Sequence, residues 1–325
     1  MSIVNIVGLF FAKQNPYTAL LSYPIRVIPL LLFFVFVDYL LHAVRLVIVV
    51  RSMGYKITFL QALENVFFNI YFSYVTPMSI GGQPFQIYHL SKIGIPTYDA
   101  TNIAITRMFV GIMVVFTVDL LLINQVISTL QGTIGLGIVL IGFLVTVGIS
   151  VAGFMAFTNQ KILFGIVKFF GKIIKSEKVK EKEESVVKWI QKMGESTKTL
   201  FLKNYWSLVI DWGLGSLASI LTPLILKTSI EAVTSVHLPL ANMWGILMML
   251  NTLVYYVPTP GSSGGIEGFY QLVFSHIYDT KSAMVGILVY RIVTYYLIIF
   301  LGTALIWRFA KIREEVNIAQ AEAKK

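Results

Sequence analysis

The sequence predicts an all-α, polytopic helical membrane protein with inverted repeats and two re-entrant broken-helix hairpins. Three observations lead to this class. Hydrophobic residues make up 56% of the chain and charged residues 13%, with a mean hydropathy of +0.77, whereas soluble domains carry about 25% charged residues. Several apolar runs exceed the roughly 20 residues that a helix needs to cross hydrocarbon. Two further apolar segments are interrupted by similar Pro- and Gly-containing motifs.

Uninterrupted apolar segments are predicted to span the membrane at about 27–50, 100–124, 133–157, 204–227 and 283–307. Their long runs of Leu, Ile, Val and Phe are typical of helices, not of the short alternating strands of an outer-membrane barrel. The segments 57–90 and 241–276 are also apolar but broken. The segment 1–23 is short and is divided by Pro16. It could either span the membrane or lie at its interface.

The two broken segments carry nearly the same motif. Residues 74–85 read YVTPMSIGGQPF and residues 256–269 read YVPTPGSSGGIEGF. In each half an Arg follows the Gly pair about 26 residues later: Arg107 follows Gly81 and Gly82, and Arg291 follows Gly264 and Gly265. Matched broken segments in the two halves of a membrane protein are the best indication from sequence of a transporter's binding site.

The distribution of Lys and Arg supports a topology in which both broken segments return to the side they entered. It places 19 of the 26 Lys and Arg residues in the cytoplasm and 4 outside, as the positive-inside rule requires. The odd span between the halves would turn the second copy upside down, which is inverted-repeat architecture. A single transmembrane domain, 1–325, is therefore expected to contain repeat one (about 27–124), a linking span (133–157), a cytoplasmic basic loop (161–203) and repeat two (about 204–307).

The basic loop 161–203 contains 11 Lys and 5 Glu. Because it lies between two spans, we interpret it as a cytoplasmic loop resting on anionic lipid headgroups and expect no nucleic-acid partner. Membrane lipids are the expected partners, and the cytoplasmic (inner) membrane is the expected location. The Gly-rich span 133–157 either faces lipid or packs closely on a neighbour. If the neighbour is a second copy of the chain, the protein is a homo-oligomer.

The sequence lacks the residues that several kinds of catalytic and metal-binding site need. The chain has no Cys, which excludes disulfides, thiol catalysis and Cys-ligated metals. Its four His residues show no metal-ligand spacing. No catalytic set and no phosphate-binding loop of the Walker type is present in the sequence, so neither a catalytic residue, a metal nor a cofactor is predicted.

The broken motifs and the buried Arg residues are the candidate substrate-binding groups. Irregular backbone at membrane depth is tolerated only where protein buries it or water reaches it, and a helix restarting after a Gly pair presents N–H groups that suit an anion. A guanidinium fits phosphate oxygens. The alternatives are packing kinks and structural ion pairs of the Arg residues with Asp119, Asp211 or Glu267. The candidates are Pro77, Gly81, Gly82, Gln83, Arg107, Pro260, Gly264, Gly265, Glu267 and Arg291.

Other ionisable residues in the predicted spans are candidates for proton transfer. Glu267 could pair with Arg291, carry a coupling proton or hold a substrate amine. Asp38, His42 and Arg45 lie on one helical stripe, and Asp211 occupies a comparable place in the second half. A proton relay and a self-neutralising stripe are both consistent with this pattern.

The motif Pro258–Glu267, with the paired Arg residues and the basic central loop, resembles the lysylphosphatidylglycerol synthase transmembrane region, over about 27–308. This is the flippase-like half of the multiple peptide resistance factor. The resemblance implies a lipid flippase, because family members that transfer lysine to phosphatidylglycerol use a separate soluble domain. Gln83 and Gln86 stand where the family often has an acidic residue and an Arg.

The expected function is transport of a lipid with an anionic phosphate headgroup across the cytoplasmic membrane. Phospholipids, aminoacyl-phospholipids and polyprenyl-phosphate-linked lipids all satisfy this description. Two alternatives stay open at this point. One is a membrane-embedded lipid-modifying transferase, such as a phosphatidylglycerol lysyltransferase, and the other is a membrane anchor for a soluble synthase.

Overall fold

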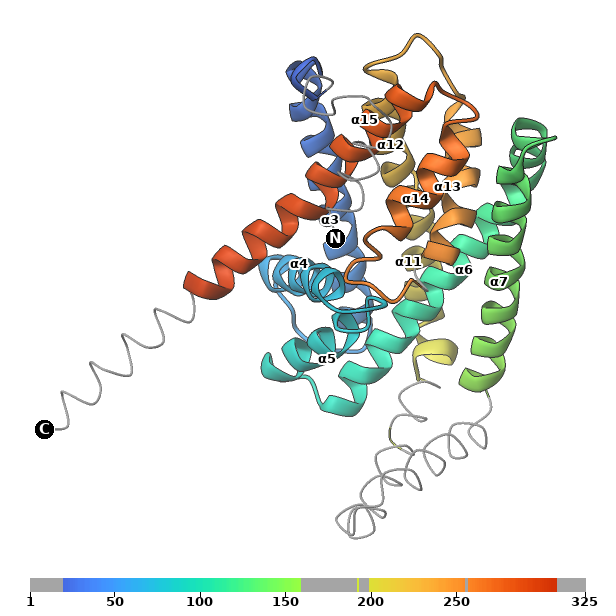
Figure 1. Cartoon of the computed structure of the whole chain (residues 1–325). Coiled ribbons are helices and arrows are strands. Elements are labelled where there is room, and N and C mark those ends of the chain that lie inside the picture. Colours follow the sequence, from blue (N-terminus) through green and yellow to red (C-terminus); the bar gives the residue numbers. More distant parts are fainter. Residues whose placement is uncertain (1–19, 159–191, 193–198, 255–256, 309–325) are drawn as a thin grey trace, which may run out of the picture.

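A computed structural model describes residues 20–158, 192, 199–254 and 257–308 (Figure 1). Within these ranges the chain is helical and forms no strand, apart from one isolated backbone bridge. The elements are η1 (Ile25–Val27), α3 (Ile28–Ser52), α4 (Phe59–Val75), α5 (Gly82–Lys92), α6 (Thr97–Leu130), α7 (Ile134–Thr158), η2 (Thr199–Lys203), α11 (Tyr205–Ala218), α12 (Leu221–Glu231), α13 (Leu240–Val254), α14 (Gly265–Phe274), α15 (Thr280–Arg291) and η3 (Ile292–Tyr296). Most of segment 1–23 and of the basic loop lies outside the described residues.

Five helical stretches in the described part of the chain are long and apolar enough to cross a membrane. They are Ile25–Ser52, Thr97–Leu130, Ile134–Ala152, Tyr205–Glu231 and Thr280–Arg308. Each contains or overlaps one predicted span, so the prediction of an all-α polytopic membrane protein is confirmed. The fourth stretch consists of α11 and α12, which are separated by a short turn at Ser219.

Glycines let three of the helices pack closely. Helix α13 lies against both α6 and α7. A Cβ on Gly142 of α7 would approach the Met249 carbonyl oxygen of α13 to 2.1 Å, and one on Gly245 of α13 would come 2.7 Å from Val126 of α6. These contacts require glycine, since real Cβ atoms essentially never come within 3.0 Å of such neighbours. Small residues at helix contacts are typical of membrane bundles.

Helices α11 and α12 run antiparallel alongside α3. At the start of α3, the Tyr23 hydroxyl donates to the Ser229 carbonyl of α12 (3.2 Å). At its end, the Asn204 amide donates to the Ser52 carbonyl (2.6 Å), and the Ser52 hydroxyl donates to that of Ser207 (3.0 Å). The end of α12 therefore lies beside the beginning of α3.

This arrangement sends the two broken hairpins toward each other. The first hairpin, α4–α5, follows the end of α3, and the second, α13–α14, follows the end of α12 at the opposite end of the pair (Figure 1). Their tips meet, because Pro77 and Pro260 form an isolated antiparallel bridge. Re-entrance into a bilayer and an inverted repeat stay predictions.

Local sequence explains why these helices are broken. The Thr58 side chain and Gln61 form a capping box that begins α4. Thr76 is extended at the end of α4 (φ −110°, ψ 145°), as expected for a residue that precedes proline. The left-handed Gly264 (φ +85°) sets the start of α14, and only glycine adopts this conformation without strain.

Gly286→Ala is expected to destabilise the protein, because its Cβ would lie 2.4 Å from the Ile230 Cα and force α15 away from α12. Overpacking of this kind costs about 1–3 kcal/mol. Thermal unfolding in detergent should show a lower Tm. Gly148→Ala in α7 is the control, since nothing lies within 4 Å of its Cβ position. Equal Tm values for the two variants would contradict the close packing of α12 on α15.

A disulfide is expected to form between the tips in the double variant Pro77→Cys/Pro260→Cys. Directly opposite residues in an antiparallel pair have Cα atoms about 4.5–5.5 Å apart, within the range that a disulfide spans. The native chain has no Cys, so mild oxidation should yield one cross-linked peptide in mass spectrometry. The pair Pro77→Cys/Lys281→Cys should give none. Failure of the first pair to cross-link would show that the tips do not meet.

Candidate functional site

The first tip, residues 76–81, is held by its own threonine. The Thr76 hydroxyl donates to the Phe72 carbonyl (2.7 Å) and accepts from the Gly81 amide (2.8 Å). Met78 and Ser79 both have left-handed backbones, with φ of 52° and 56°. Non-glycine residues rarely adopt this conformation, and such local strain clusters at functional sites.

The second tip, residues 257–264, is held by Thr259 and Glu267. The Thr259 hydroxyl donates to the Ser263 carbonyl (2.8 Å), and the Glu267 Oε2 accepts from the Gly264 amide (2.7 Å). The amides of Gly265 and Ile266 donate to the Ser262 carbonyl. The N–H groups that were predicted to face an anion at this helix start are thus already bonded within the chain, and Glu267 supplies the negative charge.

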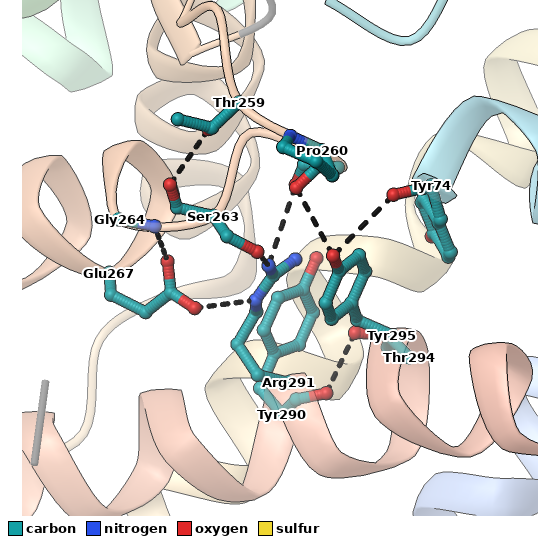
Figure 2. Close-up of polar contacts among 11 residues, drawn as sticks. Tyr74, Thr259, Pro260, Ser263, Gly264, Glu267, Tyr290, Arg291, Thr294 and Tyr295 are labelled. Atoms are coloured by element: carbon teal, nitrogen blue, oxygen red, sulfur yellow. Dashed lines mark hydrogen bonds and ion pairs between the residues drawn. The ribbon is translucent and has the colours of Figure 1, made fainter. Parts of the chain in front are cut away.

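Arg291 and Glu267 form a buried ion pair at the base of the second tip (Figure 2). The Arg291 Nε donates to the Glu267 Oε1 at 2.9 Å, and its Nη2 lies 3.0 Å from the Ser263 hydroxyl and 3.4 Å from the Gly261 carbonyl. Arg291 is 2% exposed and Glu267 5%. The guanidinium therefore holds both arms of the loop against α15.

Tyr295 connects the Arg291 cluster to both hairpins. Its ring lies under the guanidinium, 3.8 Å from the Arg291 Cζ, in a cation–π contact. Its hydroxyl is 3.1 Å from the Pro260 carbonyl and 3.5 Å from the Tyr74 carbonyl (Figure 2). Tyr295 belongs to the π-helical turn η3, and such turns are frequent at functional sites.

Close packing explains three of the glycines. A Cβ on Gly261 would lie 2.1 Å from the Tyr295 ring, and one on Gly265 would lie 2.5 Å from Val257. At Gly82 the Cβ position is occupied by the Ser73 hydroxyl (2.1 Å) and the Asn69 carbonyl (2.7 Å) of α4. Gly82 therefore lets α5 begin directly against α4.

The four predicted relay residues form one continuous chain of contacts. Asp38 lies 3.6 Å from His42, the His42 Nδ1 lies 3.3 Å from the Arg45 Nη1, and the Arg45 Nε donates to the Asp211 Oδ1 at 2.7 Å. Arg45 and Asp211 are buried. Gly215 leaves room for this guanidinium, since its Cβ would approach the Arg45 Nη2 to 2.7 Å. The pair joins the two halves of the chain through α3 and α11.

Arg107 differs from Arg291 in its bonding. It is half-buried, its Nη2 donates to the His42 carbonyl at 3.3 Å, and its buried Nε has no hydrogen-bond partner. Asp211 is the nearby acidic residue, but its Oδ1 accepts from Arg45. The two matched Arg residues thus lie in different clusters: the Nε of Arg291 is paired with a carboxylate, whereas the Nε of Arg107 has no partner.

The remaining predicted residues lie at the accessible side of the tips. Pro77 and Pro260 are exposed, whereas Gly81 and Gln83 are half-buried. Sequence reasoning missed Tyr295, although it lies one helical turn beyond Arg291 and so shares its face. Within the described ranges, no three His, Asp or Glu residues come together in a way that could hold a metal ion.

Comparison with known proteins adds the family to this geometry. The sequence profile of the lysylphosphatidylglycerol synthase transmembrane region matches residues 2–302. The chain belongs to this family. It is also similar to a UPF0104 membrane protein from Archaeoglobus fulgidus, with 23% identity over 274 residues that cover 81% of this chain and 80% of the relative. No solved structure matches it. The paired tips are thus a feature of a protein from the lysylphosphatidylglycerol synthase transmembrane family.

Glu267→Gln is expected to destabilise the protein strongly, because it leaves the Arg291 guanidinium buried without a counter-charge. Removal of one partner of a buried pair costs roughly 3–5 kcal/mol. The double variant Glu267→Gln/Arg291→Met removes both charges and should recover much of the loss. Thermal unfolding of the three proteins in detergent measures this. A Glu267→Gln protein as stable as the wild type would show that the pair is not formed.

Proposed function

We propose that this protein moves a lipid with an anionic phosphate headgroup between the leaflets of the cytoplasmic membrane. The observation that carries the proposal is the meeting of two broken-helix tips, one of which is held by the buried Arg291. Irregular backbone within a membrane bundle is tolerated where protein buries it or where it lines a water-filled cavity, and in transporters such broken helices form the substrate site. Family membership is consistent with a lipid substrate.

Arg107 is the proposed first contact for the headgroup. Its Nε has no partner and its side chain is half-buried, so a phosphate oxygen that reached this guanidinium would find a free donor. A guanidinium–phosphate contact is charge-assisted and can be bidentate. The neighbouring Arg45 already has its own partner, because its Nε donates to the Asp211 Oδ1 at 2.7 Å.

Arg291 is proposed to act later, after the tips move. In the described conformation its Nε and Nη2 donate to Glu267, Ser263 and the Gly261 carbonyl. A phosphate that bonds these two nitrogens would have to replace one of the partners, and the replacement would release the second tip from α15. Exchange of the Glu267 carboxylate for a phosphate keeps the guanidinium paired throughout and so avoids an isolated buried charge.

The exposed apolar side chains near the tips suit the acyl or prenyl part of the substrate. Met78 is 45% and Ile80 66% exposed, so a lipid tail could stay in the bilayer while its headgroup enters beside the tips. The basic segment 161–203 is proposed to rest on anionic headgroups of the cytoplasmic leaflet. We propose no enzymatic step for this chain.

Arg107→Ala should reduce the movement of a fluorescent anionic phospholipid in reconstituted liposomes by about tenfold or more, since a charge-assisted hydrogen bond contributes about 1.5–3 kcal/mol. Arg107→Lys should retain part of the rate. Arg26→Ala is the matched control, because Arg26 is exposed at the start of the first span. Dithionite quenching of the fluorescent lipid measures the rate of lipid movement for all four proteins.

An Arg107→Ala protein with the wild-type rate would remove Arg107 from the headgroup path. Wild-type liposomes that move no anionic lipid would contradict the proposed function itself. Mass spectrometry of the same lipids after incubation with aminoacyl-tRNA separates the transferase alternative, since a transferase would change the lipid mass and a transporter would not.

A further inference from the structure

Asp119 is a buried acid that takes no part in the site described above. It lies on α6, is 0% exposed, and neither of its carboxyl oxygens has a hydrogen-bond partner. Each of the other two acidic residues that are buried at 5% exposure or less, Asp211 and Glu267, is paired with an Arg. Asp119 is therefore the exception among the deeply buried acids of the described chain.

Two hydroxyl groups lie on the side of Asp119 that faces α7 and α13. The Thr146 hydroxyl of α7 lies beside the carboxyl, outside hydrogen-bond geometry. It is 2.7 Å from the Thr252 hydroxyl of α13 and 3.0 Å from the Gly142 carbonyl. A small rotation of the Asp119 or Thr146 side chain would thus give the carboxyl a hydroxyl partner.

Within the described ranges, no Lys, Arg or His forms an ion pair with this carboxyl. Helices α7 and α13 contain no Asp, Glu, Lys, Arg, His or Tyr. The titratable groups on the other helices against α6 are Tyr88, His89 and Lys92 of α5 and Tyr205 and Asp211 of α11. None of these forms a described ion pair or hydrogen bond with Asp119. On α6 itself, Arg107 is about 18 Å away along the axis at 1.5 Å per residue, while Tyr98 and Asp99 are further still.

An isolated ionised carboxylate in an apolar interior is very costly, and such a group takes up a proton instead. A divalent metal would need about six oxygen ligands. Asp119 offers a single carboxylate, and its polar neighbours on α7 and α13 are two hydroxyl groups. We propose that Asp119, with Thr146 and Thr252, forms a proton-binding site between α6, α7 and α13, and that release of this proton accompanies lipid movement.

Helix α13 connects this site to the second tip. Thr252 lies near its end, and the preceding residue, Asn251, accepts a hydrogen bond from the Tyr270 hydroxyl of α14 (2.5 Å). Charging Asp119 would draw polar groups or water toward the contact of α13 with α6 and α7. The same helix carries the loop that Arg291 and Glu267 hold. The role in lipid movement rests on the proposed function, whereas proton binding does not.

Infrared spectroscopy of the detergent-purified protein tests the proton site directly. A protonated carboxylic acid has a carbonyl band separate from the amide bands. We expect such a band at neutral pH, its loss in Asp119→Asn, and a frequency shift in Thr146→Val. Glu64→Gln, which changes a half-exposed carboxyl, should leave it unchanged. Absence of the band, or its persistence in Asp119→Asn, would overturn the proposal.

Liposomes with a pH difference across the membrane test the second part. The rate of lipid movement by the wild type should change severalfold with the pH gradient. The rate of the Asp119→Asn variant should be independent of the gradient. A wild-type rate independent of the gradient would overturn the coupling while leaving the proposed function intact. If no lipid moves at all, the proposed function and the coupling both fail, and the infrared band still decides whether Asp119 binds a proton.

Discussion

The rest of the structure depends on how polar backbone is satisfied where two helices break inside an apolar bundle. Each break frees carbonyl and amide groups that hydrocarbon cannot bond. The chain satisfies them with side chains from the breaks themselves, Thr76 and Thr259, and with the bridge between Pro77 and Pro260. Tyr295 adds a hydroxyl that reaches carbonyls of both hairpins. Each tip is therefore part of the other tip's environment.

Some of the buried charged groups are paired with one another, and others are not. The pair of Arg291 with Glu267 fixes a loop within the second half, while the pair of Arg45 with Asp211 crosses between the halves. Arg107 is left with an unused donor and Asp119 with an unused carboxyl. Two halves with matched motifs thus differ in how their charged groups are bonded.

Much of the fold could be predicted because membrane spans are local features. Length and hydrophobicity located all five spans, and proline and glycine located the breaks at Thr76 and Gly264. Side-chain partners were harder to predict. The sequence offered Asp119, Asp211 and Glu267 as partners of the Arg residues, and only contacts between distant helices could select Glu267 for Arg291 and Asp211 for Arg45. The packing role of Gly82 was equally invisible, since it depends on Ser73 and Asn69 of the adjacent helix.

The sequence by itself determined that this is a helical membrane protein with two similar broken segments, because hydrophobic length and helix-breaking residues act within a few turns of the chain. The tertiary structure decided that the two breaks meet, that Arg291 is paired with a carboxylate while the Arg107 Nε has no partner, and that the buried Asp119 has no Arg partner. These outcomes depend on residues up to 221 positions apart. Only the packing of the helices brings such residues within hydrogen-bonding distance. Periodicity and motif spacing therefore could not predict these contacts.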